Sequence, residues 1–199
     1  MKLWVLRHGE AEPHGTRPDS ERALTVKGRE EVLRSAAELI GQPLTAIYAS
    51  PLLRAQQTAE IVRTALGFVP EIRTVDWLSP DTDPDKVAEQ LVSVSDVLLV
   101  SHNPLVGNLL SYLQHGAGYP PEKVSTAGLA ELENNELLIG SMNLNGIKHR
   151  NPVGAGLNCR SVACPRYRHL GISGTPRCLY RGQAQLIQGD VGGAEFCVK

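Results

Sequence analysis

Two arginines and two histidines occupy positions in this chain where they could do chemistry together. Arg7 and His8 directly follow one apolar run, and His102 directly follows another. Arg54 lies just after a third run, at the expected first turn of a helix. Arginine presents paired donors that fit phosphate oxygens, and a neutral histidine is a nucleophile near pH 7 that can accept a phosphoryl group. These residue types predict a phosphoryl-transfer site.

The segments that must position these residues alternate between strand and helix patterns. Strands are expected at residues 2–6, 45–49, 71–75 and 96–101, followed by a pair at 128–133 and 136–144. Helices are expected at residues 25–40, 51–66, 86–94 and 105–113, with Asp85 capping the third. Alternating strands and helices favour a mostly parallel sheet with helices on both faces. The fold class is therefore α/β, a three-layer sandwich, and its last strand pair forms an antiparallel edge.

In such sheets, ligands bind outside the carboxyl ends of the strands. If the strands are neighbours, Arg7, Arg54, His8 and His102 converge there, with helix N-termini nearby that also favour an anion. Gly9 would let the backbone approach the phosphate closely. No metal or other cofactor is implied, because guanidinium groups supply the positive charge. The alternatives are ordinary strand-end residues in surface ion pairs, or a metal site at the two histidines, which zinc-ligand spacing does not support.

The four motifs, in this order and at this spacing, resemble the histidine phosphatase superfamily, also called the phosphoglycerate-mutase-like family. The resemblance covers about residues 1–145, and Leu105-Val-Gly107 is similar to its small SixA-type members. The matching segments are Leu6-Arg-His-Gly-Glu10, Leu24-Thr-Val-Lys-Gly28, Ala49-Ser-Pro-Leu-Leu-Arg-Ala-Gln-Gln-Thr58 and Val100-Ser-His-Asn-Pro104.

The resemblance implies a role for each matching residue. His8 would be the phosphorylated nucleophile, while Arg7, Arg54 and His102 would form the phosphate pocket, in which Gly9 and Asn103 would also bind phosphate. SixA-type enzymes act on phosphohistidine in proteins, so the expected partner is a histidine-phosphorylated phosphotransfer domain or phosphocarrier. A small-molecule phosphomonoesterase of the same superfamily and a non-catalytic phosphohistidine-binding module are the alternatives. The intact Arg-His-Gly segment argues against a module that only binds.

The general acid that many superfamily members use on alcohol leaving groups is not evident from the sequence. Glu10, Asp81 and Asp83 are the candidates, and each is equally explained as a solvated loop or helix-cap carboxylate. A substrate with an imidazole leaving group would need less help, because a P–N bond is easier to cleave than a P–O ester. The absence of a clear acid therefore favours phosphohistidine over sugar phosphates.

Composition divides the 199 residues into two segments of opposite charge. Residues 1–150 hold 14 Lys and Arg against 19 Asp and Glu, whereas residues 151–199 hold 6 against 2. The overall net charge of −1 does not indicate a nucleic-acid binder. No apolar run approaches the length of a membrane span. The apolar stretch at residues 1–7 is too short to be the hydrophobic region and cleavage site of a signal peptide. A cytoplasmic monomer is expected.

The segment after the last expected strand has the character of a tail. We expect a catalytic domain at residues 1–148 and an irregular, basic tail at 149–199, which contains all the cysteines: Cys159, Cys164, Cys178 and Cys197. Their spacing matches no tight zinc pattern. A metal knuckle, a disulfide framework, an interaction tail and a shifted reading frame are alternatives to a nonessential extension. His14, His115 and His149 have no partner context and are interpreted as surface or loop residues.

Overall fold

The fold is described from a computed structural model, which covers residues 1–67, 71–92 and 94–149 of the chain. The predictions for the cysteines and for the tail beyond His149 lie outside these residues. Within them, no helix is both long enough and apolar enough to cross a membrane.

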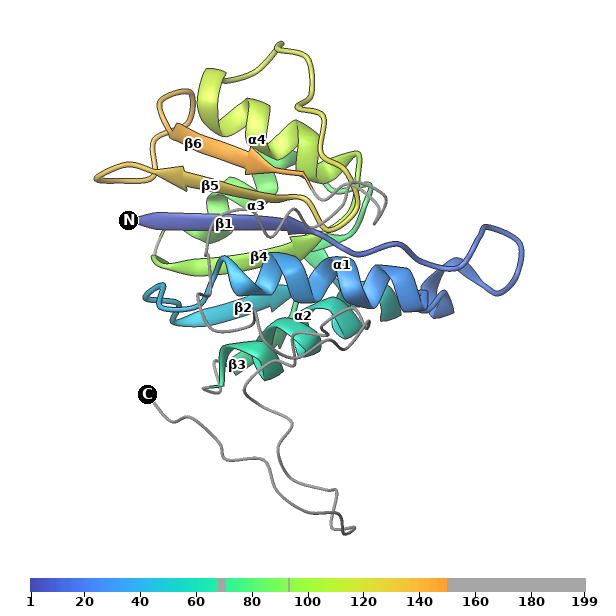
Figure 1. The fold of residues 1–199 in the computed structure, drawn as a ribbon. Coiled ribbons are helices and arrows are strands. Elements are labelled where there is room, and N and C mark those ends of the chain that lie inside the picture. The colour runs from blue at the N-terminus through green and yellow to red at the C-terminus, as the bar shows by residue number, and fades with distance from the viewer. Residues whose placement is uncertain (68–70, 93, 150–199) are drawn as a thin grey trace, which may run out of the picture. The chain divides into compact units, whose positions relative to one another are not determined.

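The described residues form alternating strands and helices, as the sequence predicts (Figure 1). The strands are β1 (Lys2–Arg7), β2 (Ala46–Ala49), β3 (Glu71–Thr74), β4 (Val97–Ser101), β5 (Leu129–Glu133) and β6 (Asn143–Lys148). The helices are α1 (Val26–Ala37), α2 (Leu53–Leu66), α3 (Pro84–Leu91) and α4 (Leu105–His115), with two short 3-10 turns, η1 (Asp19–Glu21) and η2 (Asp76–Leu78).

Within the described residues, the strands form a six-stranded sheet in the order β3-β2-β4-β1-β5-β6. Strands β1, β2, β3 and β4 run parallel, whereas β5 is antiparallel to β1 and β6 is antiparallel to β5. Arg7 pairs with Ser101 in the β1–β4 register, and Ala49 pairs with Val100 in the β2–β4 register. The carboxyl ends of β1, β4 and β2 therefore meet at one edge of the sheet. The predicted α/β fold class is confirmed.

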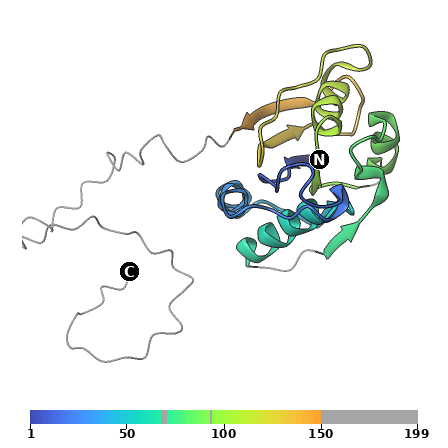
Figure 2. The same cartoon turned by 90° about the vertical axis from the view of Figure 1, so that its right-hand side faces the viewer.

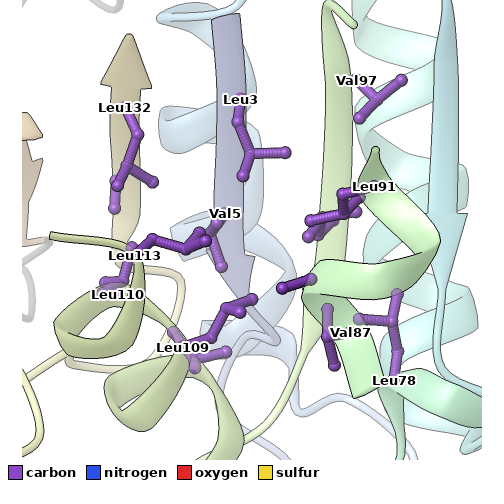
Figure 3. Packing of buried hydrophobic residues seen from close by; sticks show 14 of the residues in the cluster. Leu3, Val5, Leu78, Val87, Leu91, Val97, Leu109, Leu110, Leu113 and Leu132 are labelled. Carbon is purple, nitrogen blue, oxygen red and sulfur yellow. The ribbon is translucent and has the colours of Figure 1, made fainter. Parts of the chain in front are cut away.

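Helices cover both faces of the sheet, and each face has its own apolar core (Figures 1 and 2). Alternate residues of a strand point to opposite faces. Leu3 and Val5 therefore pack toward α3 and α4, as Figure 3 shows, while Trp4 and Leu6 pack toward α1 and α2. Because β1 and β4 are buried on both sides, the residues that follow them are held by a rigid support.

The helix ends differ in detail from the expected ones. The first helix stops at Ala37 rather than near Ile40, and α2 begins at Leu53 rather than at Pro51. Asp83, not Asp85, caps α3, because Pro84 already takes the first helical position and the Asp83 carboxylate accepts from the Asp85 N–H (3.4 Å).

The expected strand at residues 136–144 is wrong. The second strand of the antiparallel pair, β6, begins at Asn143, and the intervening residues form a connecting loop. Asn134 Nδ2 donates to the Ser141 carbonyl (3.1 Å), and Gly140 takes a positive φ of 78°. The apolar residues Leu137 to Ile139 therefore lie in a turn and not in a ladder, although their composition favours a strand.

Candidate active site

The structure brings His8 and His102 together at the carboxyl edge of the sheet. The His8 N–H donates to the Ser101 carbonyl (3.0 Å), which extends the β1–β4 ladder by one bond beyond the strands. The two imidazole ring centroids are 4.9 Å apart, and both residues are buried. The strand ends therefore place two histidines side by side, as the sequence predicts.

The His8 ring has one defined hydrogen bond. Its Nδ1 lies 2.7 Å from the carbonyl oxygen of Gly9. A carbonyl can only accept, so Nδ1 carries the ring proton and Nε2 keeps its lone pair. Burial above all, together with the nearby cations Arg54 and Arg7, lowers the pKa of His8 to about 4, against the opposing effect of the Gly9 bond. Near neutral pH, His8 is thus an uncharged imidazole with Nε2 unprotonated.

His102 is held from the opposite side by Ser50, which follows β2. Its Nε2 lies 2.8 Å from Ser50 Oγ. The backbone N–H of Leu52 points at the same oxygen (3.5 Å) and occupies one of its two lone pairs. In the described contacts Nε2 is the acceptor within reach of the hydroxyl proton, so we assign Ser50 as the donor of this bond. Burial, followed by His8 and Arg54, lowers the pKa of His102 to about 2, so this ring is neutral too. With Nε2 accepting from Ser50, the ring proton sits on Nδ1.

The two arginines reach the same place from β1 and from the first turn of α2. Arg7 Nη1 donates to the Val124 carbonyl (2.8 Å), and burial lowers the pKa of Arg7. Arg54 is held by Asp19, whose carbonyl accepts from Nη1 (2.6 Å) and whose carboxylate accepts from Nη2 (2.9 Å). Both guanidinium groups are therefore fixed at their outer ends.

Three nitrogens at this edge are buried and have no hydrogen-bond partner in the described part of the chain: Arg7 Nε, Arg54 Nε and His102 Nδ1. Leaving a buried donor unpaired costs free energy, and buried donors are nearly always satisfied. Unpaired donors on two cations and a histidine, next to an unprotonated His8, are suited to bind an oxyanion.

Packing against α1 requires a glycine at position 9, while the predicted close approach of its backbone to phosphate stays a prediction. A Cβ at Gly9 would lie 2.4 Å from the Gly28 carbonyl oxygen, and a Cβ at Gly28 would lie 2.0 Å from the Glu10 oxygen. The backbone of the loop after β1, at Gly9 and Glu10, therefore packs directly against the backbone of α1 at Gly28, with no room for a side chain at either glycine. The Gly9 N–H points at Thr58 Oγ1 (3.4 Å), so packing against α1 and α2 explains this glycine directly.

Asn103 supports the pocket wall. Its Nδ2 donates to the Val124 carbonyl (3.1 Å), the same oxygen that Arg7 binds. The side chain expected to bind phosphate is thus engaged with the 120–125 segment, where it helps to fix the acceptor that holds Arg7.

The three acid candidates are placed elsewhere or already paired. Glu10 forms an ion pair with Lys27 and accepts from Thr25 Oγ1 (3.2 Å). The hydrogen bond from Lys27 lowers the pKa of Glu10 and favours its ionised form. Asp83 caps α3, and Asp81 is exposed. In the described contacts, none of them touches either histidine or either arginine of the pocket.

Sequence reasoning missed two charged residues beside the pocket. Arg22 is buried, its Nε donates to the Glu12 carbonyl (2.7 Å), and its charge lowers the pKa of His8. Its Nη1 donates to Asp19 Oδ1 (2.7 Å), so Asp19 binds both Arg22 and Arg54. Both residues lie in a polar loop with no hydrophobic periodicity. The one sequence signal for them is that an acidic and a basic residue stand three positions apart, a spacing at which an ion pair can form.

The remaining histidines of the described residues lie where the sequence predicts. His14 is mostly exposed and faces Asp19 (3.6 Å), His115 lies against Tyr119, and His149 is close to Ser125. Among the described residues, no three or more His, Cys, Asp or Glu side chains cluster in a way that could hold a metal ion.

Comparison with known proteins identifies the family. The sequence model of the histidine phosphatase superfamily (branch 1) matches residues 3–79. The chain is 33% identical over 150 residues to phosphohistidine phosphatase SixA of Escherichia coli (strain K12), covering 72% of this chain and 91% of that protein. The chain belongs to the histidine phosphatase superfamily.

Further comparisons agree with this assignment. A phosphohistidine phosphatase SixA homolog of Haemophilus influenzae is 32% identical over 127 residues, which cover 57% of this chain and 77% of that protein. The solved structure of the protein histidine phosphatase SixA complexed with tungstate superposes with a TM-score of 0.66 at 31% identity. It covers 75% of this chain and 97% of the solved one. The predicted family and the SixA resemblance are confirmed.

Proposed function

We propose that this histidine phosphatase hydrolyses phosphohistidine in proteins through a covalent phospho-His8 intermediate. The observation that carries the proposal is the set of unpaired buried donors, Arg7 Nε, Arg54 Nε and His102 Nδ1, beside a neutral His8. We expect a phosphoryl group bound at these donors to lie beside His8, because the His8 and His102 ring centroids are 4.9 Å apart.

In the first step, His8 Nε2 attacks phosphorus, so a new P–N bond forms while the P–N bond of the substrate breaks. The leaving imidazole nitrogen takes a proton from water and departs as a neutral histidine. The His8 ring becomes a phosphorylated imidazolium, and the Gly9 carbonyl stabilises its positive charge through Nδ1–H. In the second step, water attacks phosphorus and the bond to Nε2 breaks, with its electron pair returning to Nε2. Hydrogen phosphate leaves with one proton of that water, and the other proton neutralises the hydroxide left by the first step.

The pocket stabilises the charge that spreads over the phosphoryl oxygens in both steps. Arg7 and Arg54 supply fixed positive charge, and His102 supplies a neutral N–H donor. Because these groups are held by Val124, Asp19 and Ser50 before substrate arrives, little reorganisation is needed at the moment of reaction.

The state of the nearby carboxylates favours a substrate with a P–N bond over a phosphate ester, because the two substrates have leaving groups with different needs for an acid. An alkoxide leaving group needs an acid to protonate it, whereas Glu10 is ionised in its pair with Lys27 and Asp83 caps α3. An imidazole leaving group needs less protonation, so the described carboxylates match phosphohistidine better.

The relatives support the same substrate class. Two curated relatives are named for phosphohistidine phosphatase activity, and the solved SixA structure holds tungstate, an oxyanion with the tetrahedral geometry of phosphate. We infer that a histidine-phosphorylated protein, such as a phosphotransfer domain or phosphocarrier, is the partner of this chain. A cytoplasmic location and a monomeric state remain predictions.

The substrate test is a dephosphorylation panel. Histidine-phosphorylated carrier proteins are compared with common phosphomonoesters at equal concentrations, using wild type and His8→Ala. We expect wild type to act faster on the phosphohistidine proteins and His8→Ala to be inactive on both. Equal or faster turnover of an ester would instead support the small-molecule phosphomonoesterase, and binding without turnover by both proteins would support the non-catalytic module.

A further inference from the structure

Asp19 joins the guanidinium groups of Arg54 and Arg22 beside the pocket. It lies in η1, and its carboxylate binds Arg54 Nη2 (2.9 Å) through one oxygen and Arg22 Nη1 (2.7 Å) through the other. Burial alone would raise the pKa of Asp19, but the hydrogen bonds from Arg22 and Arg54 lower it overall. A fixed negative charge therefore stands beside a pocket whose substrate and product are both anions.

The grip on Arg54 does not depend on that charge alone. The Asp19 backbone carbonyl accepts from Arg54 Nη1 (2.6 Å), so the two Nη groups both bind Asp19 while Nε stays unpaired and buried. An amide oxygen in place of the carboxylate oxygen could accept the same Nη2 bond. A substitution at Asp19 can therefore remove the negative charge next to Arg54 while Arg54 keeps its position.

The turn that carries Asp19 tolerates substitution. The Asp19 side chain is 50% exposed, and no residue of η1 is buried. The loop around it is fixed independently, because the Glu12 N–H donates to the Ala23 carbonyl (2.9 Å) and the Ala23 N–H donates to the Glu12 carboxylate (3.1 Å).

We propose that Asp19 is an internal counter-ion that limits how tightly the pocket holds phosphate, so that the product leaves after each turnover. This inference rests on the proposed function. Two or more cations around a buried anion site bind free phosphate strongly, and a pocket that retained its product would be inhibited by it. A carboxylate hydrogen-bonded to Arg54 repels a phosphate bound to the Nε side of the same guanidinium.

The test compares the affinity for inorganic phosphate in charge variants of η1. Asp19→Asn removes the charge and can keep both bonds to Arg54 through its backbone and amide oxygens, but it gives up the bond from Arg22 because an amide has one acceptor oxygen. Asp19→Ser removes the charge and keeps the backbone bond to Arg54. We expect both to bind phosphate on the order of tenfold more tightly than wild type, as measured by calorimetry and by the product inhibition constant. Glu21→Gln is the matched control, because it removes one charge from the same turn and its side chain takes part in no described ion pair. Its affinity should stay within about twofold of wild type, since exposed charges are screened.

Two further results have different meanings. If wild type turns over phosphohistidine but Asp19→Asn and Asp19→Ser bind phosphate no more tightly than wild type, the counter-ion role is wrong and the proposed function stands. If wild type neither binds phosphate nor hydrolyses phosphohistidine, the proposed function fails, and the inference fails with it.

Discussion

Ser50→Ala tests how the structure orients His102. The Ser50 hydroxyl is fully buried and lies 2.8 Å from His102 Nε2. Without it, Nε2 is a buried acceptor with no partner, which costs about 1–3 kcal/mol. The ring can avoid this cost by moving its proton to Nε2, which removes the Nδ1–H donor from the phosphate pocket.

The expected loss follows from the value of one pocket donor. Removing one preorganised donor to a developing oxyanion lowers kcat by about 100- to 1000-fold. Because the His102 ring would keep Nδ1 protonated for part of the time, we expect Ser50→Ala to lower kcat by about 10- to 100-fold. Since the donor acts on the phosphoryl oxygens over which charge is spread in the transition state, KM should change much less than kcat.

The assay combines kinetics with the state of the ring. Steady-state turnover of a histidine-phosphorylated carrier protein gives kcat and KM, and ¹⁵N NMR of the imidazole nitrogens reports which one carries the proton. Wild type should show His102 protonated on Nδ1, and Ser50→Ala should show a larger share protonated on Nε2. Ser50→Thr, which keeps a hydroxyl, should restore part of the lost activity.

Ser101→Ala is the matched control for Ser50→Ala. Ser101 is equally buried at the end of the neighbouring strand, but its Oγ donates to the Leu78 carbonyl (2.7 Å) rather than to a pocket histidine. It should lose stability without the change in the His102 proton. The reasoning is refuted if Ser50→Ala loses no more kcat than Ser101→Ala, or if the proton of His102 stays on Nδ1 in Ser50→Ala.

Three other predictions follow from the site and the packing around it. The pKa of His8 is about 4 and the neutral ring is the nucleophile, so kcat/KM in a pH–rate profile should stay flat as the pH falls from 7 and decline only near pH 4. A decline centred at about 6.5, the ordinary pKa of histidine, would contradict the burial of this ring. Gly9→Ala should destabilise the fold by about 1–3 kcal/mol in thermal denaturation, because its Cβ would lie 2.4 Å from the Gly28 carbonyl oxygen; an unchanged melting temperature would show that α1 can move away. Truncation after Arg150 should leave phosphatase activity intact, and a folded but inactive truncated protein would show that the tail takes part in catalysis.

The strand ends were predictable because hydrophobic burial marks them sharply. Strands β1 and β4 are continuous apolar runs, and the first polar residues after them must lie at the edge of the sheet. Right-handed crossovers place the carboxyl ends of parallel strands at one edge, but the meeting of His8 and His102 was predicted only if their strands are neighbours, and the sheet order shows that they are.

The partners of these residues were not predictable in the same way. Asp19 and Arg22 lie in a loop without periodicity, and Asp19 binds Arg54, a residue on a different element that lies 35 positions away in the sequence. Ser50 was visible as a strand end, but its bond to His102 depends on the register between β2 and β4. The predicted helix and strand boundaries differ from the structure where local composition conflicts with tertiary context, as at Leu53 and in the loop before Asn143.

The central claim, that His8 carries the phosphoryl group, is tested most directly by trapping the intermediate. Enzyme is mixed with a radiolabelled histidine-phosphorylated carrier protein, quenched in alkali within one turnover, digested and mapped by mass spectrometry. The mechanism predicts label on the peptide that contains His8, released by acid as expected for phosphohistidine, and none in His8→Ala. Full hydrolysis by wild type with no labelled enzyme at any quench time, or a labelled His8→Ala that still turns over, would contradict it.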